Sequence, residues 1–311
     1  MSVNFITFNM LNRVIVDNLY KIPHDIDLIV GIPRSGLLAA NIIACHLNKP
    51  LTDVDGLLTG KIFQAGFTKN KRGWIDDVSS ARKILVVEDS VMSGQSLMTM
   101  KKRLQNFDAE IIYLSIIVAP HSANLPDIFF AVVPSPRVFE WNYMHHTLLR
   151  RCCVDMDGVL CQDPTPAQND DGERYRDFCL NAIPKFIPSQ PIGFIVTARL
   201  QKYAAETEKW LAKHKVPYDN LIMLNLDSAE ERRRLGIHAN FKAQVYNAIG
   251  VAELFIESDF EQAKTIAALT NKDVFCVENS IIVRGGALLQ LKITFFCLSI
   301  IFCFTRNFLK R

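Results

Sequence analysis

The sequence has 311 residues, which is long for one ordinary domain and sufficient for two. Hydrophobic residues make up 49% and charged residues 22% of it, as in soluble proteins with buried cores. The net charge of +3 is too small to make nucleic acid the main partner. The eight cysteines include no C-x-x-C pair, which excludes a disulfide framework and a zinc site and predicts reduced thiols in the cytoplasm. Residues 1–5 lack the pattern of a secretory signal.

Short apolar runs alternate with helical patterns along most of the chain. This alternation is typical of α/β domains in which helices flank a parallel sheet. In the first half we expect strands at 26–30, 83–87, 111–118 and 128–133, and helices at 37–47 and 96–107.

An aromatic and basic stretch, 137–151, separates this series of strands and helices from a second one. We therefore expect two domains, 1–149 and 150–283, each a parallel sheet flanked by helices, followed by an apolar tail over 284–311. In the second domain we expect strands at 151–154, 192–196, 221–224, 254–256 and 274–277, and a helix at 199–214 with an apolar face.

A glycine-containing loop, 31–36, follows the first strand and precedes a helix. Its glycines allow close backbone approach, and the helix N-terminus offers unpaired N–H groups to an anion. Arg34 adds a positive charge beside Ser35 and Gly36. A simple turn is the alternative interpretation.

Two adjacent carboxylates, Glu88 and Asp89, follow the apolar strand 84–87. Acids seldom end a buried strand without a function, although a pair of solvated acids at a helix end is the alternative. The next residues open a helix, and their hydroxyl and N–H groups could surround a phosphate monoester. These residues are Ser93, Gly94, Gln95 and Ser96.

The stretch Leu85–Gly94 resembles the signature of the type I phosphoribosyltransferase family, over about residues 1–145. The resemblance implies that Glu88 and Asp89 hold the ribose hydroxyls of phosphoribosyl pyrophosphate, that residues 93–96 bind its 5′-phosphate, and that residues 33–36 bind its pyrophosphate. It also places a mobile loop at 59–74, for which a solvated basic loop is an equal alternative. The acceptor stays unknown; residues 138–142 either form part of its site or pack at the domain junction.

The sharpest motif is Asp155-Met156-Asp157-Gly158, directly after a strand. Two aspartates at this spacing are expected around a common cavity, where their repulsion favours a cation between them. One carboxylate can attack phosphorus while the other transfers protons. An Asx-rich turn is the alternative interpretation.

Thr197 follows the strand 192–196, Lys242 precedes a helix, and the acids Glu257 and Asp259 follow the strand 254–256. Together with Asp155 they resemble the haloacid dehalogenase superfamily of phosphatases, a Rossmannoid fold, over about residues 150–283. The family's common metal motif has paired aspartates, where this chain has Glu-Ser-Asp.

This second resemblance implies an aspartyl-phosphate on Asp155 and general acid/base catalysis by Asp157. It implies phosphoryl binding by Thr197 and Lys242. It also implies that Mg²⁺ is bound by Asp155, Asp157, Glu257 and Asp259. The segment 161–190 is too short for a large cap domain, and four of its charged residues either contact substrate or lie in a solvated loop. These four are Asp163, Asp170, Asp171 and Arg174.

We therefore expect a bifunctional, Mg²⁺-dependent enzyme. It would transfer a phosphoribosyl group from phosphoribosyl pyrophosphate to a small-molecule acceptor and hydrolyse a phosphate monoester, in nucleotide salvage or decoration of a metabolite. The alternative is a phosphatase whose first domain only senses phosphoribosyl pyrophosphate or a nucleotide. A homodimer and a weak membrane association through the tail stay open, since the apolar run 293–304 is too short to span a bilayer.

Overall fold

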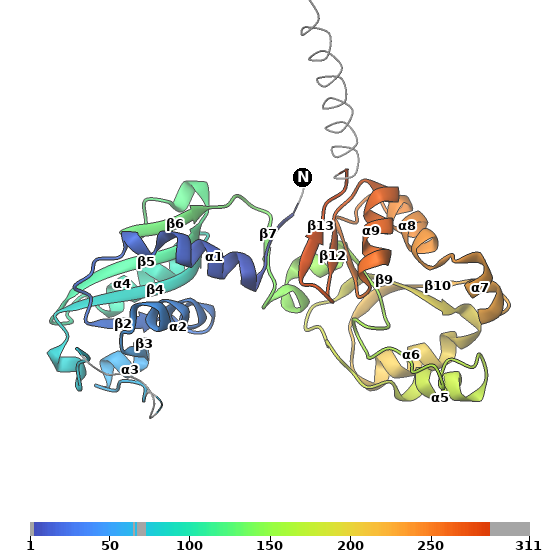
Figure 1. Cartoon of the computed structure of the whole chain (residues 1–311), viewed down its shortest axis with the longest axis horizontal. Coiled ribbons are helices and arrows are strands. Elements are labelled where there is room, and N and C mark those ends of the chain that lie inside the picture. Colours follow the sequence, from blue (N-terminus) through green and yellow to red (C-terminus); the bar gives the residue numbers. More distant parts are fainter. Residues whose placement is uncertain (1–2, 65, 67–72, 287–311) are drawn as a thin grey trace, which may run out of the picture. The chain divides into compact units, whose positions relative to one another are not determined.

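The computed structural model describes residues 3–64, 66 and 73–286. They form two compact units, each built on its own sheet (Figure 1). One unit is Ile6–Arg137, and the other combines residues 3–5 with residues 138–286. Most of the predicted tail, residues 287–311, lies outside the described residues. The predicted α/β class, with parallel sheets flanked by helices, is confirmed for both units.

The first unit contains a five-stranded parallel sheet in the order β3-β2-β4-β5-β6. Its central strands are nearly continuous apolar runs, as expected for strands that are covered on both faces. The strands are β2 (Leu28–Gly31), β3 (Leu51–Asp53), β4 (Lys83–Val91), β5 (Glu110–Val118) and β6 (Ile128–Val132); the helices are α1 (Phe8–Asn18), α2 (Ser35–Leu47), α3 (Val54–Leu58) and α4 (Gln95–Arg103).

Strand β4 runs to Val91, four residues beyond the predicted end at Val87. Its neighbour β5 is equally long and pairs with it up to the Val91–Val118 register, whereas β2 stops at Gly31, opposite Val87. Glu88 and Asp89 therefore lie within β4, just beyond the point where the neighbouring strand β2 ends.

The second unit contains a six-stranded sheet in the order β10-β9-β8-β11-β12-β13. Only β13 is antiparallel, to its neighbour β12. The strands are β8 (Cys152–Val154), β9 (Ile192–Leu200), β10 (Tyr218–Leu224), β11 (Leu254–Glu257), β12 (Val274–Cys276) and β13 (Ile281–Val283); the helices are α5 (Glu173–Asn181), α6 (Ala204–Lys213), α7 (Ala229–Leu235), α8 (His238–Ala248) and α9 (Phe260–Thr270).

The division between the units falls at Arg137/Val138, before the predicted boundary at Leu149. The residues in between belong to the core of the second unit, because Val138, Tyr143 and Leu148 are buried in its apolar cluster. The ring of Tyr143 lies 5.1 Å from that of Phe275, edge to face. Strands β1 (Asn4–Ile6) and β7 (Arg137–Phe139) pair to form a two-stranded sheet.

Short 3₁₀ helices also occur in both units. They occupy Leu19–Lys21, Val78–Ser80, Pro120–Ser122, Tyr143–His145, Thr147–Arg151 and Gln201–Tyr203.

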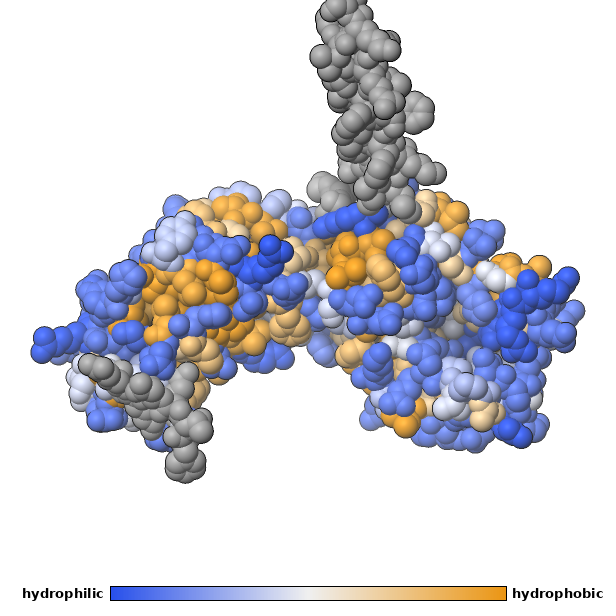
Figure 2. All heavy atoms as spheres, viewed as in Figure 1, coloured by the Kyte–Doolittle hydropathy of each residue, from blue (hydrophilic) through white to orange (hydrophobic). Residues whose placement is uncertain are grey.

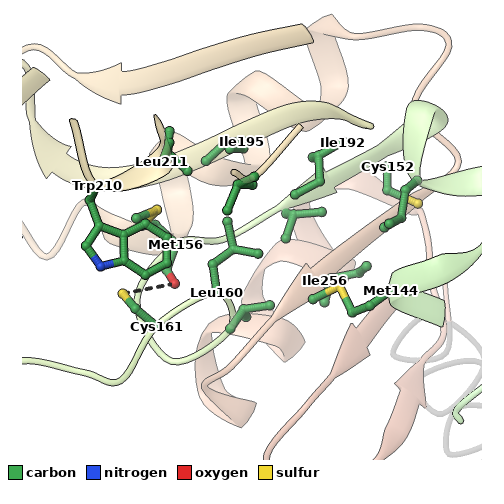
Figure 3. Close-up of a cluster of buried hydrophobic side chains, with 14 of the residues drawn as sticks. Met144, Cys152, Met156, Leu160, Cys161, Ile192, Ile195, Trp210, Leu211 and Ile256 are labelled. Carbon is green, nitrogen blue, oxygen red and sulfur yellow. Dashed lines mark hydrogen bonds between the residues drawn. The ribbon is translucent and has the colours of Figure 1, made fainter. Parts of the chain in front are cut away.

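The largest side chain in the core of the second unit is Trp210, which is fully buried. Figure 3 shows it among Met156, Leu160 and Leu211, close to the loop that follows β8. Its indole N–H donates to the carbonyl oxygen of Ala182 over 2.7 Å, so the one polar atom of the ring is satisfied. This packing fixes the position of the segment that follows β8.

Polar side chains cover much of the face shown in Figure 2, with apolar surface gathered in patches. One patch lies over α2, whose half-buried Leu37, Leu38 and Ile42 are joined by exposed Cys45. Over residues 3–64, 66 and 73–286, no helix combines the length and apolar character that a bilayer crossing needs.

We expect Gly193→Ala to destabilise the second unit by about 3 kcal/mol. A Cβ at Gly193 would lie 2.1 Å from the backbone oxygen of Arg150, which a strand within the sheet cannot avoid by a side-chain movement. Gly250→Ala is the control, because no atom lies within 4 Å of its added Cβ. Urea unfolding of the full chain measures both; equal stability of the two variants would contradict the packing described here.

Candidate functional sites

Asp155, directly after β8, is held by a lysine from a distant part of the chain. The ammonium of Lys242, on α8, lies 2.7 Å from Oδ2 of Asp155 and 2.7 Å from Oε2 of Glu257. It also donates to Oε1 of Gln262 over 3.0 Å. All three charged side chains are buried. Burial alone would lower the pKa of Lys242, but the two carboxylates raise it above its ordinary value, so Lys242 is an ammonium here.

Asp157 has a different basic partner, Arg199. Nε of Arg199 lies 3.1 Å from both carboxylate oxygens, and Nη2 lies 2.6 Å from Oδ1. The arginine side chain has no exposed surface, and its guanidinium also donates to Thr207 and covers the ring of Phe178. Two N–H groups on one carboxylate form the strongest kind of protein hydrogen-bonded ion pair.

Sequence reasoning missed Arg199, because the apolar spacing that follows it suggested a helix starting there. The helix α6 begins only at Ala204, and β9 continues through Arg199. Each of the two aspartates has its own basic side chain, and a metal cation between them stays a prediction. Both aspartates do line one pocket, as expected.

The acids after β11 have different roles. Glu257 is fully buried, and its Oε1 accepts hydrogen bonds from the N–H groups of Ser258 and Asp259 while Oε2 accepts from Lys242. Asp259 caps α9 by accepting from the N–H of Gln262 over 2.7 Å, and it lines the pocket. Glu257 therefore positions Lys242, whereas Asp259 faces the space where a ligand would lie.

The loops after β8 and β11 fit tightly at Gly158. Its φ of +77° favours glycine, and an added Cβ would lie 2.4 Å from the side chain of Ser258. The hydroxyl of Ser258 donates to the backbone oxygen of Asp157 over 3.2 Å. The close contact with Ser258 thus explains why the sequence Asp-x-Asp-Gly has a glycine at this position.

A cavity of about 450 Å³ lies over these strand ends. Thr197, at the carboxyl end of β9, lines it and is almost fully buried. Of the six residues predicted to act in catalysis or metal binding, only Glu257 does not contribute to its wall. Its lining residues include Asp155, Asp157, Asp163, Asn169, Thr197, Arg199, Arg232, His238, Lys242 and Asp259.

Oxygen ligands of the kind that Mg²⁺ prefers face this cavity from Asp155, Asp163 and Asp259. Burial raises the pKa of Asp163, and the charge of Asp157 acts in the same direction. Within the described ranges, however, no three His, Cys, Asp or Glu side chains gather closely enough to form a metal site. The carboxylate oxygens suit a hard cation, but the described residues do not form a complete set of metal ligands.

The other charged residues of segment 161–190 mostly stabilise local structure. Asp171 accepts hydrogen bonds from Tyr203 and Lys202 and from the N–H of Ala229. Asp170 accepts from two backbone N–H groups at the start of α5. Arg174 is exposed. Asp163 alone of the four predicted residues lines the cavity.

In the first unit, Glu88 and Asp89 are buried side by side near the end of β4. Oε2 of Glu88 accepts from the hydroxyl of Ser96 over 3.1 Å, and Asp89 accepts from Ser35. Burial raises the pKa of Glu88 to about 7, with the neighbouring Asp89 as the second cause. Burial also raises the pKa of Asp89, against the effects of its hydrogen bonds and of Arg137.

Two glycines bring the predicted loops to these acids. Gly36 packs so closely on β4 that an added Cβ would lie 2.7 Å from the backbone oxygen of Val87. Gly94 has a φ of +78° and precedes α4, and its added Cβ would lie 2.2 Å from Leu125. The N-termini of α2 and α4 therefore both lie at the edge where Glu88 and Asp89 emerge.

The structure places the remaining predicted residues of this unit as follows. Arg34, Ser93, Gln95 and Ser96 reach the surface. Arg34 also lines a cavity of about 580 Å³ beside α2, together with Phe63 and Trp74. Lys69, Lys71 and Arg72 of the expected mobile loop lie outside the described residues.

The aromatic side chains at the predicted acceptor surface lie in the other unit. Phe139 and Trp141 stack on one another with ring centroids 4.9 Å apart. Whether they contact an acceptor stays a prediction.

We expect the stability of the first unit to fall by about 2 kcal/mol between pH 5 and pH 8 because of Glu88. An acid whose folded pKa is raised binds its proton more tightly when folded. Its contribution is full below the unfolded pKa and is lost as the pH rises through about 7. Glu88→Gln removes the Glu88 part of the slope in urea-unfolding curves and leaves the part from Asp89, whose pKa burial also raises. Asp108→Asn, at an exposed acid, leaves the whole slope. An unchanged slope in Glu88→Gln would refute the assignment.

Comparison with known proteins agrees with the prediction made for the first half of the chain. Residues 9–146 match the family model of the phosphoribosyl transferase domain. A purine phosphoribosyltransferase from Pyrococcus horikoshii is 20% identical, with 45% of this chain and 94% of that chain covered and a TM-score of 0.33. For the xanthine-guanine-hypoxanthine phosphoribosyltransferase of Helicobacter pylori the values are 17%, 45%, 93% and 0.35. The family-model match over residues 9–146 thus agrees with the resemblance that the stretch Leu85–Gly94 predicted.

Proposed function

We propose that the chain is a bifunctional enzyme of nucleotide metabolism, a phosphoribosyltransferase joined to a phosphate-monoester hydrolase. The family match over residues 9–146 supports the first activity. The second is supported above all by Lys242, which is buried between Asp155 and Glu257 at the floor of a polar cavity.

In the first unit, Glu88 and Asp89 would accept hydrogen bonds from the hydroxyls of a ribose. The N-terminus of α4 and the hydroxyls of Ser93 and Ser96 would bind the 5′-phosphate of phosphoribosyl pyrophosphate. Residues 34–36, at the N-terminus of α2, would bind its pyrophosphate. Binding would be linked to the protonation of Glu88, because the ionised carboxylate accepts hydrogen bonds better than the neutral acid.

In the second unit, Asp155 would attack the phosphorus of a monoester, forming an aspartyl-phosphate as the bond to the leaving oxygen breaks. Asp157 would give that oxygen a proton and then take one from the water that releases phosphate. Thr197 would donate to a phosphoryl oxygen, and Lys242 would neutralise charge on the nucleophile and phosphate together. The order of the strands, β10-β9-β8-β11-β12, and its parallel direction support the predicted Rossmannoid fold.

The ion pair with Arg199 bears on the two roles of Asp157. Two N–H donors stabilise its ionised form, which is the form that accepts a proton from water. To donate a proton in the first step, Asp157 would have to leave Arg199.

Mg²⁺ belongs to this proposal. Asp155, Asp259 and the backbone oxygen of Asp157 would hold it, and it would offset the negative charge of the phosphoryl oxygens when bound. The carboxylate of Glu257 is already engaged by Lys242 and by two backbone N–H groups, which favours Asp259 as the acid that contacts the metal.

Asp155→Asn should lower phosphate release from 4-nitrophenyl phosphate by roughly a thousandfold or more, because the amide oxygen is a poor nucleophile. Incubation with labelled substrate should leave phosphate on the wild-type chain and none on the variant. Asp219→Asn, at an exposed acid of β10, is the control. Undiminished phosphate release by Asp155→Asn would show that the nucleophile is another group.

The double variant Glu88→Gln/Asp89→Asn should weaken binding of phosphoribosyl pyrophosphate about 100-fold, through the loss of charge-assisted hydrogen bonds. Calorimetry with Mg²⁺ present measures the affinity, and pyrophosphate release in a screen of acceptors measures the transfer. A sensor would instead show tight binding, no pyrophosphate release with any acceptor, and a ligand-dependent change in the phosphatase rate.

A further inference from the structure

Arg232, on α7, is a buried guanidinium in the wall of the second unit's cavity. It is only 6% exposed, and it lines the cavity together with Asp155 and Lys242. Nη1 donates to the backbone oxygen of Ala198 over 2.7 Å. This bond holds the guanidinium at the carboxyl end of β9, one residue beyond Thr197.

The two other buried cations around the cavity are paired with acids: Lys242 lies against two carboxylates and Arg199 against Asp157. Lys185 is exposed to solvent. Arg232 has no acidic oxygen within 4.0 Å in the described part of the chain. A buried charge without a counter-charge costs several kcal/mol, so its anion is expected from outside the chain.

A second observation points to a ligand. Nε of Arg232 and Oδ1 of Asn169 are buried and have no hydrogen-bond partner among the described residues, and both residues line this cavity. The remaining such atoms are the second oxygens of Glu206 and Glu253, whose first oxygens form ion pairs. The unsatisfied donor and the unsatisfied acceptor therefore share one cavity.

The position of Arg232 relative to the sheet separates it from the nucleophile. Asp155 follows β8, whereas Arg232 donates to Ala198 near the end of the neighbouring strand β9. Neighbouring strands lie about 5 Å apart. The guanidinium is therefore beside the position of a phosphoryl group on Asp155. The cavity of about 450 Å³ is within the size range of small-molecule sites.

We propose that Arg232 binds a second anionic group of the substrate, so that the second unit prefers phosphate esters whose alcohol part bears another phosphate or a carboxylate. Asn169 accepts a hydrogen bond from a hydroxyl of the same molecule. His238, which also lines the cavity, contributes a neutral ring, since burial lowers its pKa to about 4 and Arg232 acts in the same direction. This inference rests on the proposed phosphatase activity.

The experiment compares esters that differ only in the second anion: ribose 1,5-bisphosphate with ribose 5-phosphate, and 3-phosphoglycerate with glycerol 3-phosphate. For the full-length wild type, kcat/KM should be at least tenfold higher for the member with two anions in at least one pair. Arg232→Gln should lower kcat/KM for that member about 100-fold and for its partner by less than threefold. Arg234→Gln, an exposed arginine of the same helix, should change neither.

Equal values within both pairs for the wild type would overturn the inference. So would an equal loss for both members in Arg232→Gln, because Arg232 would then act on the transferred phosphoryl group or on the fold alone. Arg232→Lys, which keeps the charge, should retain part of the preference and serves if Arg232→Gln does not fold.

Binding separates this inference from the phosphatase proposal. With Asp155→Asn as background, calorimetry should show about 100-fold tighter binding of ribose 1,5-bisphosphate than of ribose 5-phosphate, and added Arg232→Gln should remove the difference. If this preference is found while the wild type hydrolyses no ester, the phosphatase proposal fails and the inference on Arg232 stands. Equal binding of the two esters overturns the inference.

Discussion

The ammonium of Lys242 lies 2.7 Å from carboxylate oxygens of both Asp155 and Glu257, and all three side chains are buried. Removing charges from water costs several kcal/mol per ion, which is recovered only when the charges meet at hydrogen-bonding distance. Strands β8 and β11 and helix α8 are therefore tied to one another by electrostatics as well as by apolar packing. The position of Asp155, and with it the floor of the cavity, depends on this triad.

The first unit meets the same constraint in a different way. Glu88 and Asp89 are buried without an ammonium between them; hydroxyls of Ser96 and Ser35 are their neighbours. Burial is the main cause of the upward shift in the pKa of Glu88 to about 7, and the charge of Asp89 adds to it. The second site thus pairs its buried acids with the cations Lys242 and Arg199, whereas serine hydroxyls donate to the buried acids of the first site.

Much of the site could be predicted from the sequence, because polar residues directly after apolar strands are easily recognised in an α/β sequence. Asp155, Thr197 and Lys242 were predicted to share a site, and they line one cavity. The partner of Asp157 was not predictable, because Arg199 precedes a run with helical spacing and nothing local shows that β9 continues through it. Arg232 was not predicted as a site residue for a related reason: in a run of three arginines, only packing decides which one is buried. Glu257 looked like a metal ligand, and its bonds to backbone N–H groups appear only in three dimensions.

The ion pair between Asp155 and Lys242 joins residues 87 positions apart in the chain. During synthesis, a ribosome releases Asp155 and the central strand well before it releases α8 and β11. Until then, the carboxylate has no counter-charge and favours a hydrated position over a buried one. The charge pairing that completes the site therefore also delays its closure, so the second sheet is expected to consolidate late, after α8 and β11 have been synthesised.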